Sequence, residues 1–511
     1  MERRIRRLGI FMVLCFLALF IQLNNIQVLK ANSLANNPAN PGVLAVERSQ
    51  PRGSILSSDG VILASSVAAN SGAYKYRRVY NPDTATLFSQ IVGFDSPIYG
   101  QTGVESTYNS YLESHTRPAH SLRDLLVNRT TTDNVTLTIN SQLQLKVAAR
   151  VDEIDADGTA PHAAAVVINV KTGAIEAMYG LPTYDPSGLV SLNTTTEHTA
   201  YQDLVLGPQA AGQVSPTLSQ AYQDGVEPGS TFKVVTSSAV YDHDPSLANH
   251  IYPAATCING PNEPPKITGR PEPLCNYPGE DCGGNLQSSL PASCDTAFAQ
   301  MGIALGPNLG VEAQAFGFNQ QPPIDLTGAA VSSFPAPSAL TPVDQALSAT
   351  AAFGQGFGSG TVIASPLQMA LVAAGIANQG VIMTPHVMQS IRDSQGNLVE
   401  TYTPKPWLTA TSPLTASAVT TLMEGVVTHG TAVGVFPASW DVAAKTGTAE
   451  TGTGPLGNSL TNDWMIAFAP ANDPTVAVAV SVPNQGPSET GALVSGPPTR
   501  DILGDALAAG F

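Results

Sequence analysis

The segment 227-EPGSTFKVVTSSAVY-241 joins a Pro-Gly turn to a stretch of helical character. Ser230 therefore falls at the expected start of a helix, where free N–H groups and the positive end of the helix dipole favour developing negative charge. Lys233 follows three residues later, so its amine is expected over the same helical face as the serine hydroxyl. A hydroxyl is a weak nucleophile, and a neutral amine held beside it can take its proton. The S-x-x-K pattern recurs by chance in long chains, however, and alone it is more typical of an ordinary N-cap serine.

A second pattern, KTGTAE, begins at Lys445 and offers an ammonium group, the hydroxyl of Thr446 and a glycine. Gly447 is expected to let a substrate backbone approach closely, because it has no side chain that would block a cleft. A Lys-Thr-Gly sequence also stands at residues 171–173, where we interpret it as a hairpin turn. The later copy differs in its position and in the Thr448 that follows, so it is the candidate site.

A third pattern, SCDTAF, begins at Ser293. The order S-x-x-K, then S-x-N or a variant, then K-T-G is the one found in class A β-lactamases and penicillin-binding proteins. Each pattern is common alone, whereas all of them in this order are specific. The chain therefore resembles the serine D,D-peptidases and their β-lactamase relatives.

The resemblance covers nearly the whole chain. The C-terminal part contains segments typical of transpeptidases: GQG at 354–356, SPLQMA at 365–370, ANQG at 377–380, MEGVVTHGTA at 423–432 and DWMIAFAP at 463–470. The N-terminal part contains segments that resemble the pedestal motifs of class B penicillin-binding proteins: Arg52-Gly53-Ser54-Ile55, Arg78-Val79-Tyr80 and Gly103-Val104-Glu105. No glycosyltransferase domain fits before residue 158, which excludes the bifunctional class A type. The chain thus resembles class B penicillin-binding proteins of the actinobacterial penicillin-binding protein A type, and its low-charge, alanine-rich composition also looks actinobacterial.

This resemblance implies a peptidoglycan D,D-transpeptidase that needs no cofactor and no metal. Ser230 would attack the penultimate D-Ala carbonyl of a stem pentapeptide, release the terminal D-Ala and form an acyl-enzyme, with Lys233 as the base. Ser293 would relay the proton to the leaving nitrogen, and Lys445 would keep the local field positive. An amine of a neighbouring stem would then resolve the acyl-enzyme and close the crosslink.

The resemblance also implies how the substrate is held. Thr446 and Thr448, on either side of Gly447, would bind the substrate carboxylate. The backbone N–H groups of Ser230 and Thr448 would form the oxyanion hole, in which each donor is often worth ~3 kcal/mol.

Asp295 departs from the family pattern, which has an asparagine at this position. An asparagine amide can donate a hydrogen bond to a substrate carbonyl, whereas an ionised carboxylate only accepts. A carboxylate in the cleft could pair with Lys233 or Lys445 and raise its pKa, which would weaken the base. The alternatives are a protonated Asp295, a contact with a substrate N–H, reduced activity, or a tolerated polar substitution.

The N-terminus predicts a membrane anchor. Arg3, Arg4, Arg6 and Arg7 precede the apolar run LGIFMVLCFLALFI at residues 8–21, and the uncharged stretch continues to residue 29. About 20 residues are needed to cross the hydrocarbon core, and that length is reached only by counting to residue 29. The arginines predict that the N-terminal end stays in the cytoplasm. A cleavable signal peptide is the alternative, but no small-x-small cleavage pattern follows the apolar run.

These features predict an α+β chain in successive parts. The predicted parts are a cytoplasmic tail at 1–7, a transmembrane signal anchor at 8–29, an elongated, mainly-β/α class B pedestal or dimerisation domain at 30–157, and a transpeptidase domain at 158–511. The last is expected to contain an antiparallel sheet flanked by helices, as in β-lactamases. Asp59-Gly60 predicts a hairpin in the pedestal. The expected location is a single pass through the bacterial cell membrane, with the catalytic domain outside the cytoplasm.

The cysteines agree with an exported domain. Cys257, Cys275, Cys282 and Cys294 lie within 38 residues and allow three pairings. None of their gaps is a C-x2-C or C-x4-C spacing, so they do not predict a zinc site. An oxidising compartment favours one or two disulfides over free buried thiols. A disulfide from Cys294, beside Asp295, would brace the cleft wall.

Charge and family together limit the partners. The formal net charge of −16 argues against a nucleic-acid partner, because a phosphate backbone would be repelled. The resemblance implies stem peptides and β-lactams as ligands, a membrane glycosyltransferase of the SEDS family, and other divisome or elongasome proteins. The rival functions are a D,D-carboxypeptidase and a weakened scaffold or β-lactam sensor; a serine β-lactamase is disfavoured because no added base for deacylation is evident.

Overall fold

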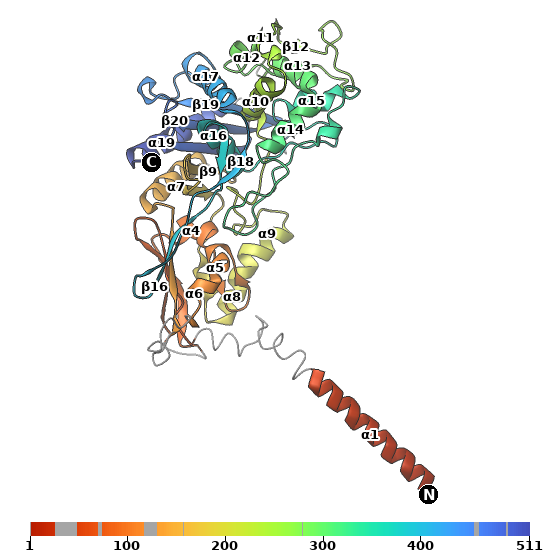
Figure 1. Ribbon diagram of the computed structural model, residues 1–511, viewed down its shortest axis with the longest axis vertical. Coiled ribbons are helices and arrows are strands. Elements are labelled where there is room, and N and C mark those ends of the chain that lie inside the picture. The colour runs from red at the N-terminus through yellow and green to blue at the C-terminus, as the bar shows by residue number, and fades with distance from the viewer. Residues whose placement is uncertain are drawn as a thin grey trace.

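The structure, a computed structural model, describes residues 2–25, 49–69, 74–116, 130–156, 158–277, 279–453, 459–486 and 489–511. Figure 1 shows one group of strands and helices around β16 and α4–α6 in its lower half and a second group around β19, β20 and α10–α17 in its upper half. We call these the lower and upper units. Each is built on its own large sheet.

The upper unit contains a five-stranded antiparallel sheet in the order β10-β9-β21-β20-β19. Its strands are β9 (Ala164–Asn169), β10 (Ile175–Gly180), β19 (Ala443–Thr453), β20 (Ser459–Ala469) and β21 (Val476–Gln485). Strand β21 reads VAVAVSVPNQ and is buried at nearly every position, because helices cover both faces of the sheet. Those helices are α7 (Ser141–Ile154), α16 (Pro366–Ala377), α17 (Pro413–His429) and α19 (Gly496–Ala508). The prediction of an α+β chain with an antiparallel sheet flanked by helices is confirmed.

The remaining elements of the upper unit include those that carry the patterns around Ser230 and Asp295 and four of the cysteines. They are η5 (Gly229–Phe232), α10 (Lys233–His243), α11 (Ser246–Asn249), α12 (Leu286–Ser289), α13 (Asp295–Leu305), α14 (Pro307–Ala315), η6 (Pro337–Ala339), α15 (Gln345–Ala351), η7 (Ala438–Trp440) and α18 (Gly491–Val494). Short strand pairs join β11 (Tyr252–Ala255) to β14 (Cys282–Gly284), β12 (Cys257–Ile258) to β13 (Leu274–Cys275), and β15 (Val381–Met383) to β18 (Pro406–Thr409).

Both predicted turns are present. Residues 171–173 join β9 to β10 as a hairpin, and Gly173 has a φ of +79°, a conformation that favours glycine. Gly60, with a φ of +83°, closes the hairpin between β1 and β2. The earlier Lys-Thr-Gly copy is therefore a turn, as its sequence predicts.

The lower unit is built on a six-stranded sheet in the order β17-β16-β8-β1-β2-β3. Its strands are β1 (Ile55–Leu56), β2 (Ile62–Ala68), β3 (Tyr76–Tyr80), β8 (Asp133–Leu137), β16 (Met388–Asp393) and β17 (Leu398–Thr401). Strand β16 is antiparallel to β8, with Ile391 opposite Val135. Two strands from the C-terminal part of the sequence therefore complete this sheet, so the predicted boundary at residue 158 does not divide it.

Among the residues that the structure describes, helices cover the lower sheet, three from before residue 158 and four from after it. They are α4 (Ala85–Val92), α5 (Gly103–Thr107), α6 (Asn109–Leu112), η3 (Pro186–Val190), α8 (Thr194–Tyr201), η4 (Gln202–Leu206) and α9 (Gly207–Ala210). Two short strand pairs accompany them: β4 (Asp95–Ser96) pairs with β5 (Gly100–Gln101), and β6 (His115–Thr116) pairs with β7 (Thr130–Thr131). Helices α8 and α9 follow residue 158 but lie beside α5 and α6 in Figure 1. The lower unit thus takes a second segment from the later part of the chain.

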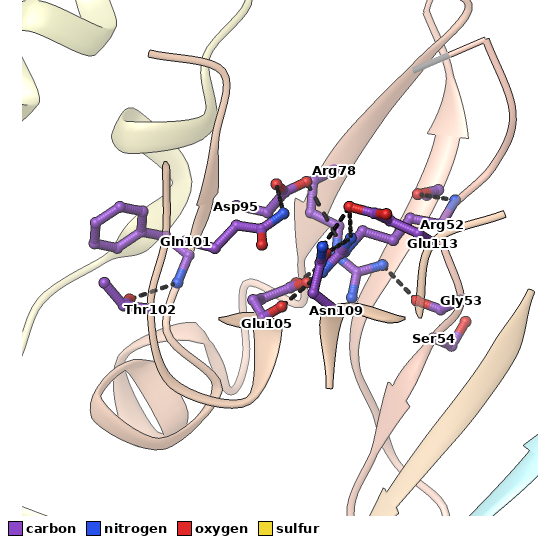
Figure 2. Close-up of polar contacts among 12 residues, drawn as sticks. Arg52, Gly53, Ser54, Arg78, Asp95, Gln101, Thr102, Glu105, Asn109 and Glu113 are labelled. Atoms are coloured by element: carbon purple, nitrogen blue, oxygen red, sulfur yellow. Dashed lines mark hydrogen bonds and ion pairs between the residues drawn. The ribbon is translucent and has the colours of Figure 1, made fainter. Parts of the chain in front are cut away.

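The pedestal motifs meet in one buried ion-pair cluster (Figure 2). The Glu105 side chain is fully buried and accepts hydrogen bonds from Arg52 Nε at 2.7 Å and from Arg78 Nε at 2.5 Å. Arg78 Nη1 also donates to the Gly53 carbonyl at 2.7 Å, and Tyr80 OH lies 3.2 Å from Glu105 Oε1. These contacts explain why the three motifs occur together, since each supplies part of the cluster.

The predicted anchor at 8–29 is described only in part. Helix α1 (Glu2–Asn24) covers most of it, and apolar side chains such as Phe11 and Phe16 are exposed on this helix. The end of the predicted anchor falls within residues 26–48, which lie outside the described residues. Within the described part of the chain, no helix combines the length and apolarity needed to cross a bilayer.

Replacing Glu105 with glutamine should strongly destabilise the protein. The substitution keeps the side-chain shape but leaves two buried guanidinium groups without their shared carboxylate. We expect the free energy of unfolding, measured by urea denaturation, to fall by about 3–5 kcal/mol. The control is Glu113→Gln, because the Glu113 side chain is 34% exposed and its carboxylate lies 4.0 Å from Arg52 Nη1. That change should cost less than about 1 kcal/mol; equal losses for the two variants would contradict this account of the cluster.

Candidate active site

Ser230 lies in η5, a single 3-10 turn that runs directly into α10. The sequence places it at the start of a helix, and the structure agrees, although α10 itself begins only at Lys233. Gly229, with a φ of +54°, precedes Ser230, and a Cβ there would lie 2.9 Å from the carbonyl of Thr448. The turn that carries the serine therefore packs directly against strand β19, and only glycine fits between them.

Lys233 is completely buried beside this turn. Its Nζ donates to the Ser293 carbonyl at 2.6 Å and to Asp295 Oδ1 at 2.6 Å, and lies 3.3 Å from Ser293 Oγ. It also lies 5.2 Å from the ring centre of Phe298, close enough for a cation–π contact. The amine was expected over the Ser230 hydroxyl, but the hydrogen bonds described for it reach Ser293 and Asp295. The pattern that begins at Ser293 thus holds the lysine of the S-x-x-K pattern in place.

Ser293 joins the two lysines. Its hydroxyl accepts a hydrogen bond from Lys445 Nζ at 2.9 Å and a longer one from Lys233 Nζ at 3.3 Å. Ser293 has a φ of +57°, which is unusual for a residue with a side chain. Backbone strain of this kind persists only where the surrounding contacts fix it. Here the carbonyl and the hydroxyl of one serine are both bound to lysine.

Lys445 is fully buried on β19, the strand that ends the five-stranded sheet. Besides Ser293, its Nζ contacts the Thr446 carbonyl at 2.9 Å. Burial holds the pKa of Lys445 well below its ordinary value, and the nearby Lys233 charge lowers this pKa further. The negative charge of Asp295 acts in the opposite direction.

Asp295 forms an ion pair with Lys233, one of the contacts that the sequence suggested. It is the first residue of α13, where the positive end of the helix dipole favours a carboxylate. Burial lowers the pKa of Lys233, while the charge and hydrogen bond of Asp295 raise it. The effect of burial is the larger, so the net pKa of Lys233 lies below its ordinary value. Asp295 weakens the base as predicted, but its effect on the Lys233 pKa offsets only part of the lowering by burial.

Thr446 and Thr448 line the cleft, but Gly447 does not. A Cβ at Gly447 would lie 2.7 Å from the Pro228 carbonyl and 2.9 Å from Thr231 Cγ2. The expectation that this glycine opens the cleft to a substrate backbone is therefore wrong. Its missing side chain instead makes room for the turn that carries the nucleophile.

These residues converge on one cleft of about 480 Å³. Of the predicted residues, Ser230, Ser293, Asp295, Thr446 and Thr448 line it, while Lys233 and Lys445 lie buried behind Ser293. Sequence reasoning did not select the remaining lining residues: Tyr277, Glu280, Ala292, His429, Gly430, Thr431, Thr490, Gly491 and Ala492. Thr431 could have been found, because it stands in the family-like segment at 423–432 and its hydroxyl lies 2.6 Å from that of Thr446.

Comparison with known proteins places these motifs in a family. Residues 163–504 match the family described as the penicillin binding protein transpeptidase domain, and residues 52–135 match the penicillin binding protein A dimerisation domain. The chain is 34% identical over 523 aligned residues to the peptidoglycan D,D-transpeptidase PbpA of Mycolicibacterium smegmatis, covering all of both chains. It is 32% identical to PbpA of Mycobacterium tuberculosis, covering 99% of each.

This chain belongs to the class B penicillin-binding transpeptidases. Among solved structures, the ceftriaxone acyl-enzyme of M. tuberculosis penicillin-binding protein A superposes with a TM-score of 0.76 at 30% identity, covering 91% of this chain and 100% of that one. Its penicillin G acyl-enzyme gives a TM-score of 0.75 at 31% identity, with coverages of 90% and 100%. The family expected from the sequence is confirmed, as is its enzymatic class, the serine-type peptidoglycan D,D-transpeptidases.

Four of the five cysteines of this transpeptidase form two disulfides. Disulfides join Cys257 to Cys275 and Cys282 to Cys294. Cys294 lies between Ser293 and Asp295, so the second disulfide ties the start of α13 to strand β14. Sequence alone left the pairing open among three arrangements.

Replacing Asp295 with asparagine should shift the pH dependence of acylation. Because the carboxylate raises the pKa of Lys233, its removal should let the lysine become neutral at lower pH. We expect the ascending limb of the acylation rate by a fluorescent penicillin to move to lower pH, so that the variant reacts faster than the wild type near pH 6. The control is Glu280→Gln, an exposed change in the cleft wall, which should leave that limb in place. An unchanged limb in Asp295→Asn would show that the ion pair does not control the base.

Proposed function

We propose that this enzyme crosslinks peptidoglycan through an acyl-enzyme on Ser230. The Ser230 oxygen attacks the penultimate D-Ala carbonyl of a stem pentapeptide, while its proton passes to the neutral amine of Lys233. The C–N bond to the terminal D-Ala then breaks, and the leaving nitrogen receives a proton through the Ser293 hydroxyl. An ester on Ser230 and free D-Ala result.

The observation that carries this proposal is the Ser293 hydroxyl between two buried amines. Its contacts with Lys233 and Lys445 form a continuous polar path beside the cleft. Ser230 is the residue of η5 that lines this cleft in the described part of the chain. Burial lowers the pKa of both lysines, so the proton of Lys233 is easier to lose than that of an exposed lysine. The proton of Ser230 can therefore pass to Lys233, and the leaving nitrogen can receive a proton through the Ser293 hydroxyl.

Strand β19 supports the proposed binding of the acyl donor. It ends the described five-stranded sheet, so one side of its backbone is open to an extended peptide. The hydroxyls of Thr446 and Thr448 line the same cleft and suit the terminal carboxylate. The N–H groups of Ser230 and Thr448 would stabilise the oxyanion, since the close packing at Gly229 brings their backbones together.

Alanine at Ser230 should abolish the reaction without unfolding the enzyme. We expect no covalent labelling by a fluorescent penicillin and no D-Ala release from pentapeptide-bearing substrate, while the melting temperature stays within about 2 °C of the wild type. The positive control is Ser215→Ala, a serine whose hydroxyl contacts Leu204 and Thr217 outside the cleft, which should label normally. D-Ala release by the wild type without crosslinked product would point to the D,D-carboxypeptidase. Labelling of Ser230→Ala would refute the proposed nucleophile.

We infer that α1 begins a signal anchor that holds the catalytic unit outside the cytoplasm. The arginines before the apolar run and the exposed apolar side chains of α1 support this location. An anchored transpeptidase would work beside a polytopic SEDS-family glycosyltransferase, with other divisome or elongasome proteins, because new strands and their crosslinks must be made at the same place.

Removing residues 2–29 should release the protein from the membrane fraction. We expect the full chain to sediment with membranes and to be digested by protease added outside spheroplasts. The same full chain, but not the truncated one, should co-purify with a SEDS glycosyltransferase from detergent extracts. Equal sedimentation of both chains would contradict the anchor.

A further inference from the structure

A buried carboxyl group lies directly behind the cleft. Asp463 on β20 is fully buried, and it is the cross-strand partner of Thr448 on β19. Side chains of directly opposite residues project from the same face of a sheet. The acylation steps described above make no use of Asp463, although its nearest strand neighbour lines the cleft.

The Asp463 carboxyl is incompletely hydrogen-bonded. Its Oδ2 accepts from the Thr461 hydroxyl at 3.3 Å, whereas Oδ1 is buried without a formed hydrogen bond in the described part of the chain. The Ser495 hydroxyl donates to the Asp463 carbonyl at 2.9 Å and helps to fix the backbone. A buried oxygen without a partner is costly, so the proton of a neighbouring hydroxyl should be drawn to it.

The Thr448 hydroxyl stands between this carboxyl and the cleft. It accepts a hydrogen bond from the Gly491 N–H at 3.0 Å, which occupies one of its two lone pairs. An ionised Asp463 can only accept, so it would draw the Thr448 proton inward. A protonated Asp463 can donate to the second lone pair, which leaves the Thr448 proton free to point into the cleft.

We propose that Asp463 is a positioning residue whose protonated form turns the Thr448 hydroxyl toward the carboxylate of the bound acyl donor. This inference rests on the proposed function, in which Thr448 holds that carboxylate. The ionised form has the opposite effect, because it takes the Thr448 proton and adds a negative charge behind the carboxylate site. Asp463 therefore controls the binding of the acyl donor and leaves the bond-making steps to Ser230 and Lys233.

The surroundings of Asp463 make this protonation sensitive to pH near neutrality. Burial raises the pKa of Asp463 to about 7, with a further contribution from the charge of Glu489. The neighbouring hydroxyls of Thr448 and Thr461, which can donate to the ionised carboxyl, oppose the rise. The protonated form is therefore present below about pH 7 and is lost as the pH rises above it.

Few other titratable groups face this carboxyl. Glu489 approaches from the segment before α18, and Tyr277 from the segment before β14. On β21 the opposite residue is Val482, and α18 presents Gly491 toward Thr448. Lys445 and Lys233 lie buried behind Ser293, and Asp463 is not among the groups that shift the pKa of either lysine. The alkaline limb of the reaction can therefore be assigned by substitution at Asp463.

The test is the pH profile of Asp463→Asn in the full-length protein. The second-order rate constant of acylation by a fluorescent penicillin, which carries the relevant carboxylate, is measured from pH 5.5 to 9. The asparagine amide can donate to Thr448 at every pH, so the descending limb should move to higher pH. At pH 8.5 the variant should react roughly tenfold faster than the wild type, the ratio that one hydrogen bond to a charged group contributes. The change should appear in the apparent binding constant and not in the limiting rate.

A Thr448→Val background supplies the control. There, Asp463→Asn should change the rate much less, because the hydroxyl that Asp463 positions is absent and only the charge of the ionised carboxylate behind the site is removed. If Asp463 acted instead by keeping Lys445 charged, Asp463→Asn would move the descending limb to lower pH, and that result would overturn the proposal. An unmoved limb in a variant with wild-type melting temperature would also overturn it. Absence of Ser230-dependent labelling at every pH would instead overturn the proposed function, and this inference with it.

Discussion

Two lysine side chains buried next to each other constrain everything else in the site. Neither Lys233 nor Lys445 has any exposed surface, and removing an ammonium group from water costs several kcal/mol. The fold offsets part of this cost with the Asp295 carboxylate, the carbonyl of Ser293 and the ring of Phe298. Because the compensation is incomplete, both amines lose protons more readily than in water. The burial that costs folding free energy therefore also lowers the pKa of Lys233, which favours the neutral amine that acts as the base.

Close packing between main-chain segments brings the three catalytic sequence patterns together around the two buried lysines. Gly229 lets the serine turn contact β19, and Gly447 gives β19 room for that turn. Gly491 repeats the arrangement from the other side, since a Cβ there would lie 2.2 Å from the Gly447 carbonyl. The glycines therefore set distances between main chains. The hydroxyls and amines then follow from the positions of the strands and helices that bear them.

The sequence predicts the parts of the site that depend on short spacings. Ser230, Ser293 and their companion lysines were found because each belongs to a pattern of a few residues, and the hairpin turns were found for the same reason. The meeting of Lys233 with Asp295 appeared only as one alternative, because the pairing depends on how two helices approach. The sequence assigned Gly447 to substrate access, whereas in the structure its missing side chain makes room for the turn that carries Ser230. Asp463 stands in the family-like segment at 463–470, but nothing in that segment marks it as part of the site, since its importance comes from its neighbour across the sheet.

The six-stranded sheet has a consequence for how such enzymes can change during evolution. Strand β16 reaches this sheet from far along the chain and pairs with β8, so the lower unit is completed only after most of the upper unit has been synthesised. Exchange of the N-terminal segment alone between relatives would leave the recipient's β16 facing a foreign strand. A substitution in residues 388–393 must therefore remain compatible with the pairing of a strand more than 200 positions earlier, at residues 133–137.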